Sequence, residues 1–257
     1  MTEFSGKTAA VTGAASGLGR AVAIGLAKHG AETLILIDRD RKGIDATAAE
    51  ISSETAVEKF AIDVSDAAAV RSVGAALAKT LPGLDILVTA AGVLGPAVPI
   101  VDCPEDEWDR VFAVNVRGTY LCIRHFMPLI RARGRGSVVT FASTAGLVGS
   151  PVIGVYSASK GAVVLMTRSL AVQHAAEGIR FNCVCPGSIE TPMLEQTLGS
   201  AGDAAAVATR TEAYRHRHPM LRFGQADEVA AAVLFLASNA ASYMTGVALP
   251  VDGGRLA

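Results

Sequence analysis

The stretch "TAAVTGAASGLGRAVAIGLAKHG", residues 8–30, decides the fold. A short apolar run at 8–13 ends in Gly13, Gly17 and Gly19 follow, and a helical pattern runs through 19–30. Glycines let a backbone turn tightly and approach a pyrophosphate, and a helix N-terminus supplies free N–H groups for it. The spacing is G-x-x-x-G-x-G and not the usual G-x-G-x-x-G, so its position directly after a strand is what favours a dinucleotide site.

Further apolar runs recur along the chain, with helical stretches such as 154–177 and 227–238 between them. They lie at 33–38, 57–63, 84–92, 137–143, 179–187 and 246–254. Continuous apolar strands that alternate with helices indicate a parallel sheet covered on both faces. The sequence therefore predicts an α/β fold, a Rossmann-like doubly wound parallel sheet of about seven strands with right-handed crossovers.

Composition indicates one large domain over 1–257. The chain has 257 residues, 51% hydrophobic, without repeats or a Pro/Ser-rich linker. The least regular region, about 190–222, is expected to form helices and a mobile segment outside the sheet. A formal net charge of -1 argues against binding to nucleic acid or to an anionic membrane surface.

Location and metal content follow from what the sequence lacks. The N-terminal stretch has no basic region followed by an apolar one, so we expect no signal peptide and a cytoplasmic protein. The uncharged stretch 136–159 is interrupted by Ser, Gly and Pro, which favours a buried strand and turn over a spanning helix.

The four cysteines form no CxxC pair, so we expect neither a zinc site nor a disulfide framework. Cys183 and Cys185 are expected to alternate across one buried strand.

Two acidic residues end predicted strands near the glycine loop. Asp38 lies about 20 residues past the loop, where a carboxylate accepts hydrogen bonds from a ribose 2′-hydroxyl and repels a 2′-phosphate. Ser16 is neutral, whereas Arg39 could serve a phosphate. NAD is therefore favoured over NADP, and helix capping is the alternative role of Asp38. Asp63 could face the adenine or cap a helix that begins near residue 65.

The stretch "VYSASKGA", 155–162, places Tyr156 and Lys160 on one helical face. A nearby ammonium lowers the pKa of a phenol, so the pair suits an acid/base for alcohol oxidation or ketone reduction, although a solvated helix surface is the alternative. Ser143 ends the fifth predicted strand at the carboxyl edge, where open sheets bind ligands. It could hold a substrate oxygen. The chain has no G-x-S-x-G elbow, which disfavours a serine nucleophile.

These motifs together resemble the short-chain dehydrogenase/reductase family. "TGAASGLG" at 12–19 resembles its cofactor loop, and Ser143 with "YSASK" at 156–160 keeps the family's 13-residue interval between Ser and Tyr. Similar segments, in order over nearly the whole chain, are "VNVRG" at 114–118, "CPGSIETPM" at 185–193 and "VDGG" at 251–254. One departure is Thr89, where the family usually has Asn. We expect it to change the local geometry of the sheet near the cofactor more than the activity.

The resemblance implies roles for individual residues. Tyr156 is the acid/base, Lys160 lowers its pKa and binds the nicotinamide ribose, and Ser143 stabilises the substrate oxygen. Asn115 positions a water in a proton relay toward Lys160, unless it is an ordinary polar residue within a helix. NAD-binding residues are implied at Gly13, Ser16, Gly17, Leu18, Gly19, Asp38, Asp63, Val64, Ala90, Gly92, Tyr156, Lys160, Pro186, Gly187, Ile189 and Thr191.

The implied function is hydride transfer between NAD(H) and a secondary alcohol or ketone. The alternatives are a 3-oxoacyl thioester reductase, which usually uses NADP, and a non-catalytic nucleotide-sensing protein on the same fold. The resemblance also implies a homotetramer, built through the helices that carry Asn115 and Tyr156 and through the C-terminal strand.

The resemblance further implies that 190–222 covers the substrate as a lid. Its end, "RTEAYRHRHPMLR" at 210–222, carries a cluster of basic residues with one acid, Glu212: Arg210, Arg215, Arg217 and Arg222, with His216 and His218 between them. Arginine suits carboxylate, sulfonate or phosphate, so the lid could bind an anionic substrate group. A solvated helix face or contacts between subunits are the alternatives.

Overall fold

The computed structural model describes residues 3–200 and 202–257, and it contains one seven-stranded sheet. The strand order is β3-β2-β1-β4-β5-β6-β7, and every pairing is parallel. The strands are β1 (Thr8–Thr12), β2 (Thr33–Asp38), β3 (Ala56–Ala61), β4 (Ile86–Thr89), β5 (Gly136–Phe141), β6 (Ile179–Pro186) and β7 (Ala248–Val251). The order reverses between β1 and β4, which confirms the predicted doubly wound fold and opens a crevice at their carboxyl ends.

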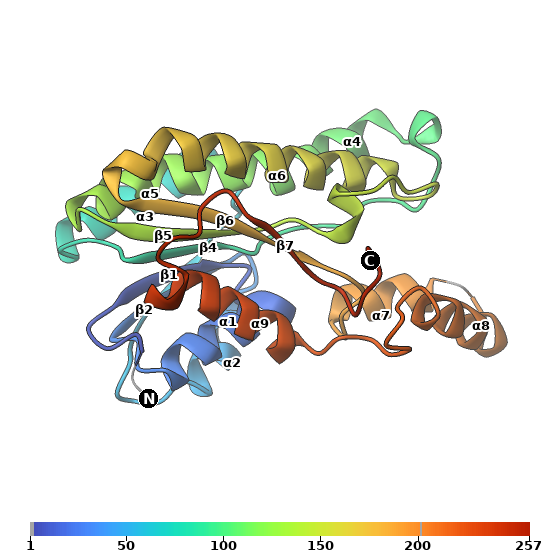
Figure 1. The fold of residues 1–257 in the computed structure, drawn as a ribbon, viewed down its shortest axis with the longest axis horizontal. Coiled ribbons are helices and arrows are strands. Elements are labelled where there is room, and N and C mark those ends of the chain that lie inside the picture. Colours follow the sequence, from blue (N-terminus) through green and yellow to red (C-terminus); the bar gives the residue numbers. More distant parts are fainter. Residues whose placement is uncertain (1–2, 201) are drawn as a thin grey trace.

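Helices cover both faces of the sheet (Figure 1). One face carries α1 (Gly17–Lys28), α2 (Arg41–Ala49) and α9 (Ala226–Ala237). The other carries α3 (Ala67–Thr80), α5 (Thr119–Ala132) and α6 (Gly154–His174), with α4 (Glu105–Phe112) at its end. Short helical turns are η1 (Ile100–Asp102), η2 (Ala113–Gly118), η3 (Thr144–Gly146), η4 (Ala175–Glu177) and η5 (Asn239–Ala241).

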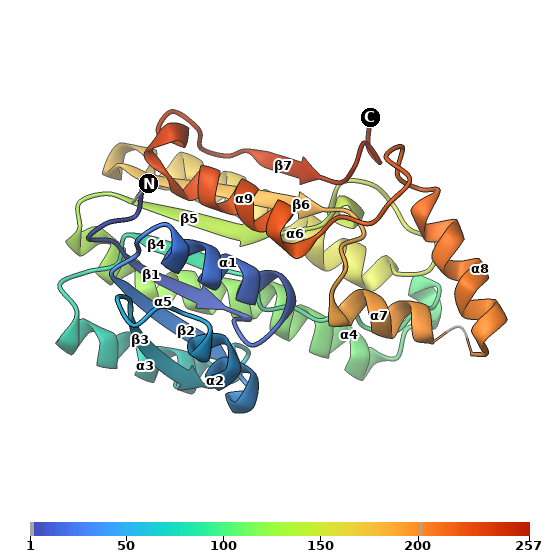
Figure 2. The ribbon, with the colours of Figure 1, turned by 90° about the horizontal axis from the view of Figure 1, so that it is seen from below.

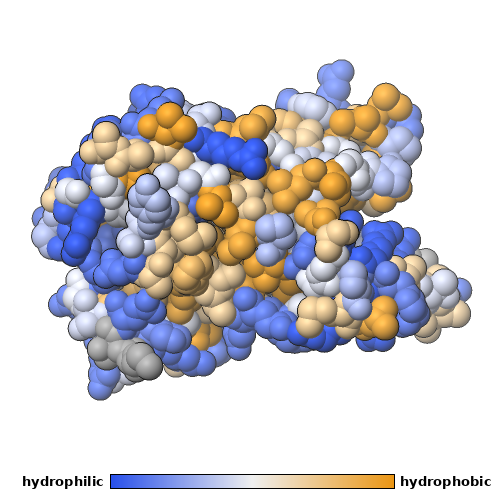
Figure 3. Space-filling view, in the orientation of Figure 1, coloured by the Kyte–Doolittle hydropathy of each residue, from blue (hydrophilic) through white to orange (hydrophobic). Residues whose placement is uncertain are grey.

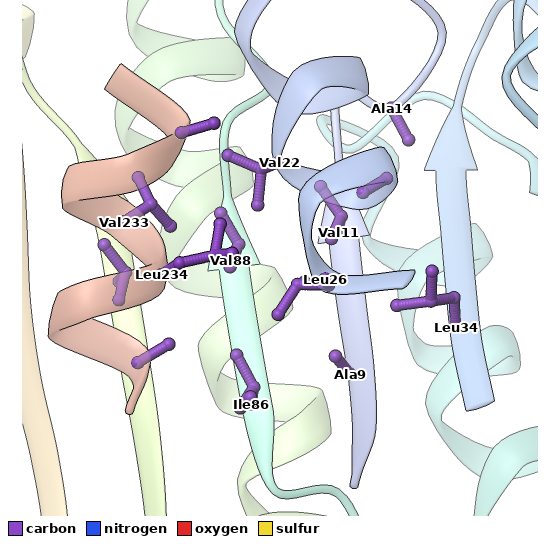
Figure 4. Packing of buried hydrophobic residues seen from close by; sticks show 14 of the residues in the cluster. Ala9, Val11, Ala14, Val22, Leu26, Leu34, Ile86, Val88, Val233 and Leu234 are labelled. Carbon is purple, nitrogen blue, oxygen red and sulfur yellow. The ribbon is translucent and has the colours of Figure 1, made fainter. Parts of the chain in front are cut away.

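The alternation of side chains along β1 joins the strand to both helical layers. Ala9 and Val11 belong to the core cluster that contains Leu26 of α1 and Val233 of α9, whereas Ala10 belongs to the cluster under α3 and α5. Figure 4 shows the first cluster, with side chains of α1 and α9 meeting those of β1 and β4. Burial on both faces explains why these strands read as continuous apolar runs.

Two helices lie beyond the carboxyl ends of the strands. They are α7 (Pro192–Gly199) and α8 (Ala204–Arg215), and Figure 2 shows them past the arrowheads of the central strands. They occupy the range 190–222 that the sequence assigns to helices outside the sheet; of this range, residue 201 lies outside the described part. In residues 3–200 and 202–257, no helix combines the length and apolarity that crossing a bilayer requires.

The predicted strand ends are too late by up to three residues. β3 ends at Ala61 and β5 at Phe141, so Asp63 and Ser143 each lie two residues into the following loop. Both remain at the carboxyl edge, because parallel strands all end on the same side. Cys183 and Cys185 do not lie on opposite faces. Residues two apart on a strand share a face, and their sulfurs are 4.0 Å apart.

Candidate active site

The glycine loop between β1 and α1 forms the floor of a groove. Gly13 and Gly17 have φ of +70° and +52°, a region that favours glycine. A Cβ at Gly13 would lie 2.7 Å from the backbone nitrogen of Ala91, and one at Gly19 would collide with the carbonyl of Gly13. The loop therefore lies flat against the strand ends only because these positions are glycine, and its open surface fits a dinucleotide.

The carboxylate of Asp38 is fixed at the rim of this groove. Its Oδ2 accepts the Ala15 N–H at 3.1 Å and its Oδ1 accepts the Asp40 N–H at 3.0 Å. The groove has a volume of ≈ 350 Å³. Predicted cofactor residues in its lining are Gly13, Ser16, Gly17, Leu18, Gly19, Asp38, Asp63, Val64, Ala90, Gly92 and Thr191.

Asp63 faces the groove and does not cap the next helix. Partial burial would raise the pKa of Asp63, but hydrogen bonds from the hydroxyl and N–H of Ser65, with the charge of Arg39, lower it below its usual value. The cap of α3 is Asp66, whose carboxylate accepts the N–H groups of residues 68 and 69. Asp63 is thus an ionised carboxylate whose partners leave it at the edge of the groove.

A second pocket of ≈ 180 Å³ continues the groove toward α7 and α8. Its lining includes the predicted residues Ser143, Tyr156, Lys160, Pro186, Gly187 and Ile189. The pocket and the groove share Leu18, Ala90, Gly92, Thr191 and Met193. In Figure 3 the surface is notched between the part formed by α4 with the start of α6 and the part formed by α7 and α8. All the predicted cofactor residues therefore line one continuous cleft.

Tyr156 and Lys160 lie one turn apart at the start of α6, as predicted. The Lys160 Nζ is 5.6 Å from the centre of the Tyr156 ring and donates to the Phe141 carbonyl at 2.8 Å. Burial lowers the pKa of Lys160 to about 8, although the charges of Cys185 and Cys183 act in the opposite direction. Burial raises the pKa of Tyr156 to about 12, and its interaction with Ser143 opposes this.

The lowering of the Tyr156 pKa expected from Lys160 does not appear in this arrangement. The ammonium hydrogen-bonds a carbonyl and faces the ring, so the loss of hydration dominates the phenol. Ser143 is the group that stabilises the phenolate here.

Asn115 is buried beneath the pocket and does not line it. It lies in η2, a π-helical turn between α4 and α5, a feature frequent at functional sites. Its Oδ1 accepts the Val93 N–H at 2.8 Å, and its Nδ2 donates to the Val93 carbonyl at 2.9 Å and to Ser159 Oγ at 3.0 Å. A Cβ at Gly92 would lie 3.3 Å from both Asn115 Oδ1 and Lys160 Nζ. Asn115 thus joins the loop after β4 to α6 beside Lys160.

Comparison with known proteins agrees with this arrangement. A family model described as enoyl-(acyl carrier protein) reductase matches residues 13–255. The chain is 39% identical to 2-(S)-hydroxypropyl-CoM dehydrogenase 3 of Xanthobacter autotrophicus, over 96% of each protein. The chain belongs to the short-chain dehydrogenase/reductase family.

Two further relatives extend the comparison. The chain is 37% identical to 2-dehydro-3-deoxy-L-rhamnonate dehydrogenase (NAD(+)) of a Sphingomonas species, over 98% of this chain and 96% of the relative. The crystal structure of a levodione reductase superimposes with a TM-score of 0.93 at 35% identity, covering 98% of each chain. This short-chain dehydrogenase/reductase is accordingly an oxidoreductase that acts on CH–OH donors with a nicotinamide cofactor.

Thr89, where the family usually has Asn, changes the hydrogen bonding at the end of β4. Thr89 ends β4 and is buried, and its hydroxyl has no hydrogen-bond partner in the described part of the chain. A buried hydroxyl without a partner loses the hydrogen bonds that water gave it, which destabilises the fold.

His218 is a residue whose role the sequence did not indicate. It is fully buried rather than part of a charged surface. Its Nε2 accepts the Ser188 N–H at 3.1 Å, and its Nδ1 donates to the Tyr214 carbonyl at 3.0 Å. His218 therefore ties the segment after β6, which follows the predicted cofactor residues Pro186 and Gly187, to the end of α8.

Most of the arginines predicted to face the substrate have other partners. Arg210 donates to the Thr197 carbonyl and to Ser200 Oγ. Two others form ion pairs, Arg215 with Glu212 and Arg222 with Glu228. Of the four, only Arg217 lines the pocket, and Arg255, near the C-terminus, lines it too.

Proposed function

We propose that this chain is an NAD-dependent oxidoreductase that interconverts a secondary alcohol and its ketone. The observation that carries the proposal is the placement of Ser143 and Tyr156 in the wall of one pocket, directly continuous with the groove that holds Asp38. Two hydroxyl groups at this point suit a substrate oxygen. A nicotinamide cofactor, when bound, accepts or supplies the hydride.

Tyr156 is the proposed acid/base. A pKa of about 12 leaves its phenol protonated at neutral pH, ready to donate to a ketone oxygen. Ser143 is proposed to donate its single hydroxyl proton to the same substrate oxygen. Lys160, which lines the same pocket next to the Tyr156 ring, is proposed to bind the nicotinamide ribose.

Asn115 is proposed as a positioning residue. Its Nδ2 donates to Val93 and Ser159, its Oδ1 accepts the Val93 N–H, and its main-chain carbonyl accepts the Thr119 hydroxyl at 2.9 Å. It therefore holds the loop that faces Lys160. The water relay that the resemblance implies stays a prediction.

The preference for NAD rests on Asp38. Its carboxylate is held by two backbone N–H groups at the end of β2, where it would repel a 2′-phosphate. The neighbouring Arg39 acts on Asp63, whose pKa it lowers. The rhamnonate dehydrogenase relative, named for NAD(+), supports the same choice.

A 3-oxoacyl thioester reductase is the second candidate, because the description of the matching family model names an acyl carrier protein. It would use the same Ser143 and Tyr156 on a carbonyl oxygen. A non-catalytic nucleotide sensor is disfavoured by the intact set of Ser143, Tyr156 and Lys160 in one pocket.

The proposal also includes a homotetramer, a lid over the pocket and a cytoplasmic location. On α6, Leu165 and Val172 are 64% and 84% exposed, which favours burial in a symmetric homotetramer. Helices α7 and α8 are proposed as the lid, since Met193, Leu194 and Tyr214 line the pocket. The four free cysteines fit a reducing compartment, so the proposal includes the cytoplasm.

The test is a panel of neutral secondary alcohols, ketones and 3-oxoacyl thioesters with NAD(H) and NADP(H), followed at the nicotinamide absorbance. We expect turnover with NAD(H), and a fall of about 10²–10⁴-fold in Tyr156→Phe. Titration of NADH fluorescence should show that this variant still binds the cofactor. Near-normal turnover by Tyr156→Phe, or a wild type that prefers NADP, would contradict the proposal.

A further inference from the structure

Two arginines at the substrate pocket form no ion pair with a carboxylate in the described part of the chain. Arg217 and Arg255 line the same pocket as Ser143 and Tyr156. Across residues 3–200 and 202–257, neither guanidinium forms an ion pair with an acidic side chain. The Arg217 guanidinium instead lies over the ring of Tyr214, 4.1 Å from its centre. This pocket therefore carries two positive charges that form no ion pair with the described residues.

The two guanidinium groups are close enough to affect each other. Partial burial lowers the pKa of Arg255, the charge of Arg217 lowers it further, and Tyr214 and Asp252 act in the opposite direction. The Asp252 carboxylate accepts the N–H groups of Gly254 and Leu256, so it serves the backbone of the C-terminal turn. Two cations held together in this way repel each other, and a bound anion would relieve the repulsion.

Hydrogen bonds of the backbone and of His218 fix the two chain segments that carry these arginines. The Met220 N–H donates to the Gly253 carbonyl at 3.2 Å, which joins the segment after α8 to the C-terminal turn. Gly253 and Gly254 have φ of +60° and +86°, conformations that allow this turn. His218, next to Arg217, is anchored to Ser188. Such preorganisation reduces the entropy lost when a ligand is bound.

We propose that Arg217 and Arg255 form an anion subsite, so that the substrate is a hydroxy or oxo compound that carries a carboxylate, sulfonate or phosphate group. The inference rests on the proposed function, because it uses the same pocket. The planar guanidinium fork matches the oxygens of these groups. Ser143 and Tyr156 hold the reacting oxygen, and the arginines hold the anion. The apolar side chains of Val152, Ile153 and Met193 face the part of the substrate between them.

The test compares hydroxy acids with their neutral amides at matched chain length. The variants are Arg217→Gln, Arg255→Gln and the control Arg215→Gln, which removes a lid arginine that does not line the pocket. We expect each pocket variant to lower kcat/KM for the acid by about 10–100-fold, mainly through KM. The amides should change by less than about threefold, and the control should change neither. Parallel carboxylate, sulfonate and phosphate substrates then show which oxyanion fits best.

A binding measurement keeps the inference separate from the proposed function. Isothermal titration of the NADH-loaded protein uses a saturated carboxylate or sulfonate that has no hydroxyl or keto group. Binding by the wild type that Arg217→Gln and Arg255→Gln lose supports the subsite even where no substrate is turned over. Equal losses for acids and amides, no loss for either, or no binding of the anion would overturn it. Absence of turnover for every alcohol and ketone would instead count against the proposed function alone.

Discussion

We expect the buried ammonium group of Lys160 to lower the free energy of unfolding of this protein. Burial lowers its pKa from 10.5 to about 8, so between these two values the unfolded chain binds more protons than the folded one. Stability should therefore rise with pH in this window and be lowest, for this group, below pH 8. The difference between 10.5 and about 8 corresponds to about 3 kcal/mol at pH 7 and to less than about 1 kcal/mol at pH 10.

The replacement Lys160→Met keeps an unbranched side chain and removes the charge. It also removes the hydrogen bond to the Phe141 carbonyl, which contributes about 1 kcal/mol. We therefore expect the variant to be more stable than the wild type by about 2 kcal/mol at pH 7, and about equally stable at pH 10. Tyr156 does not disturb this comparison, because its raised pKa reduces stability only as pH rises from about 10 toward about 12.

The assay is urea unfolding of wild type and variant at pH 7, 8, 9 and 10, at one protein concentration so that subunit association is matched. Lys79→Met, which replaces an exposed lysine on α3, is the control for the loss of a lysine. A stability difference for Lys160→Met that does not change with pH, or a loss at pH 7, would refute the reasoning.

Three further predictions concern the cofactor, the sheet edge and assembly. Asp38→Ala should lower the ratio of kcat/KM for NAD over NADP by about 10–100-fold, because the charge that repels a 2′-phosphate is gone; an unchanged ratio would remove Asp38 from this role. Thr89→Val should raise the free energy of unfolding by about 1–2 kcal/mol in urea titration, since its buried hydroxyl has no partner in the described chain, and a loss of stability would contradict this. Val172→Glu should shift light scattering from a tetramer to smaller species, whereas a wild type that is already monomeric at micromolar concentration would exclude the assembly.

The parts of the fold and site that depend on local chemistry could be predicted from the sequence. Gly13 and Gly17 are required by a turn that only glycine adopts easily, and Asp38 follows because a parallel strand must end beside that turn. The strand ends were placed too late at Asp63 and Ser143, since small and apolar residues continue past the ends of β3 and β5. The error did not move either residue from the carboxyl edge of the sheet.

Ionisation states could not be predicted in the same way. The spacing of Tyr156 and Lys160 predicts a shared face but not the partner of each polar atom. The ammonium hydrogen-bonds the Phe141 carbonyl, a residue 19 positions away on β5, and this contact exists only once α6 packs on the sheet. Burial then shifts both groups toward their neutral forms, and no pattern of neighbouring residues encodes its extent.

The same reasoning explains why the partners of the arginines in 210–222 could not be predicted from the sequence. Arg210, Arg215 and Arg217 are equivalent in a string of letters, but the helix directs Arg210 to Thr197 and lets Arg215 reach Glu212. Arg217 differs from the other two because the next residue, His218, is hydrogen-bonded to Ser188. The fold also brings Arg255, near the C-terminus, to the same pocket. The proposed subsite combines segments 217–220 and 252–256 and so has no local signature. Charge in the range 190–222 therefore favours an anion site only where the fold leaves that charge without a partner among the described residues.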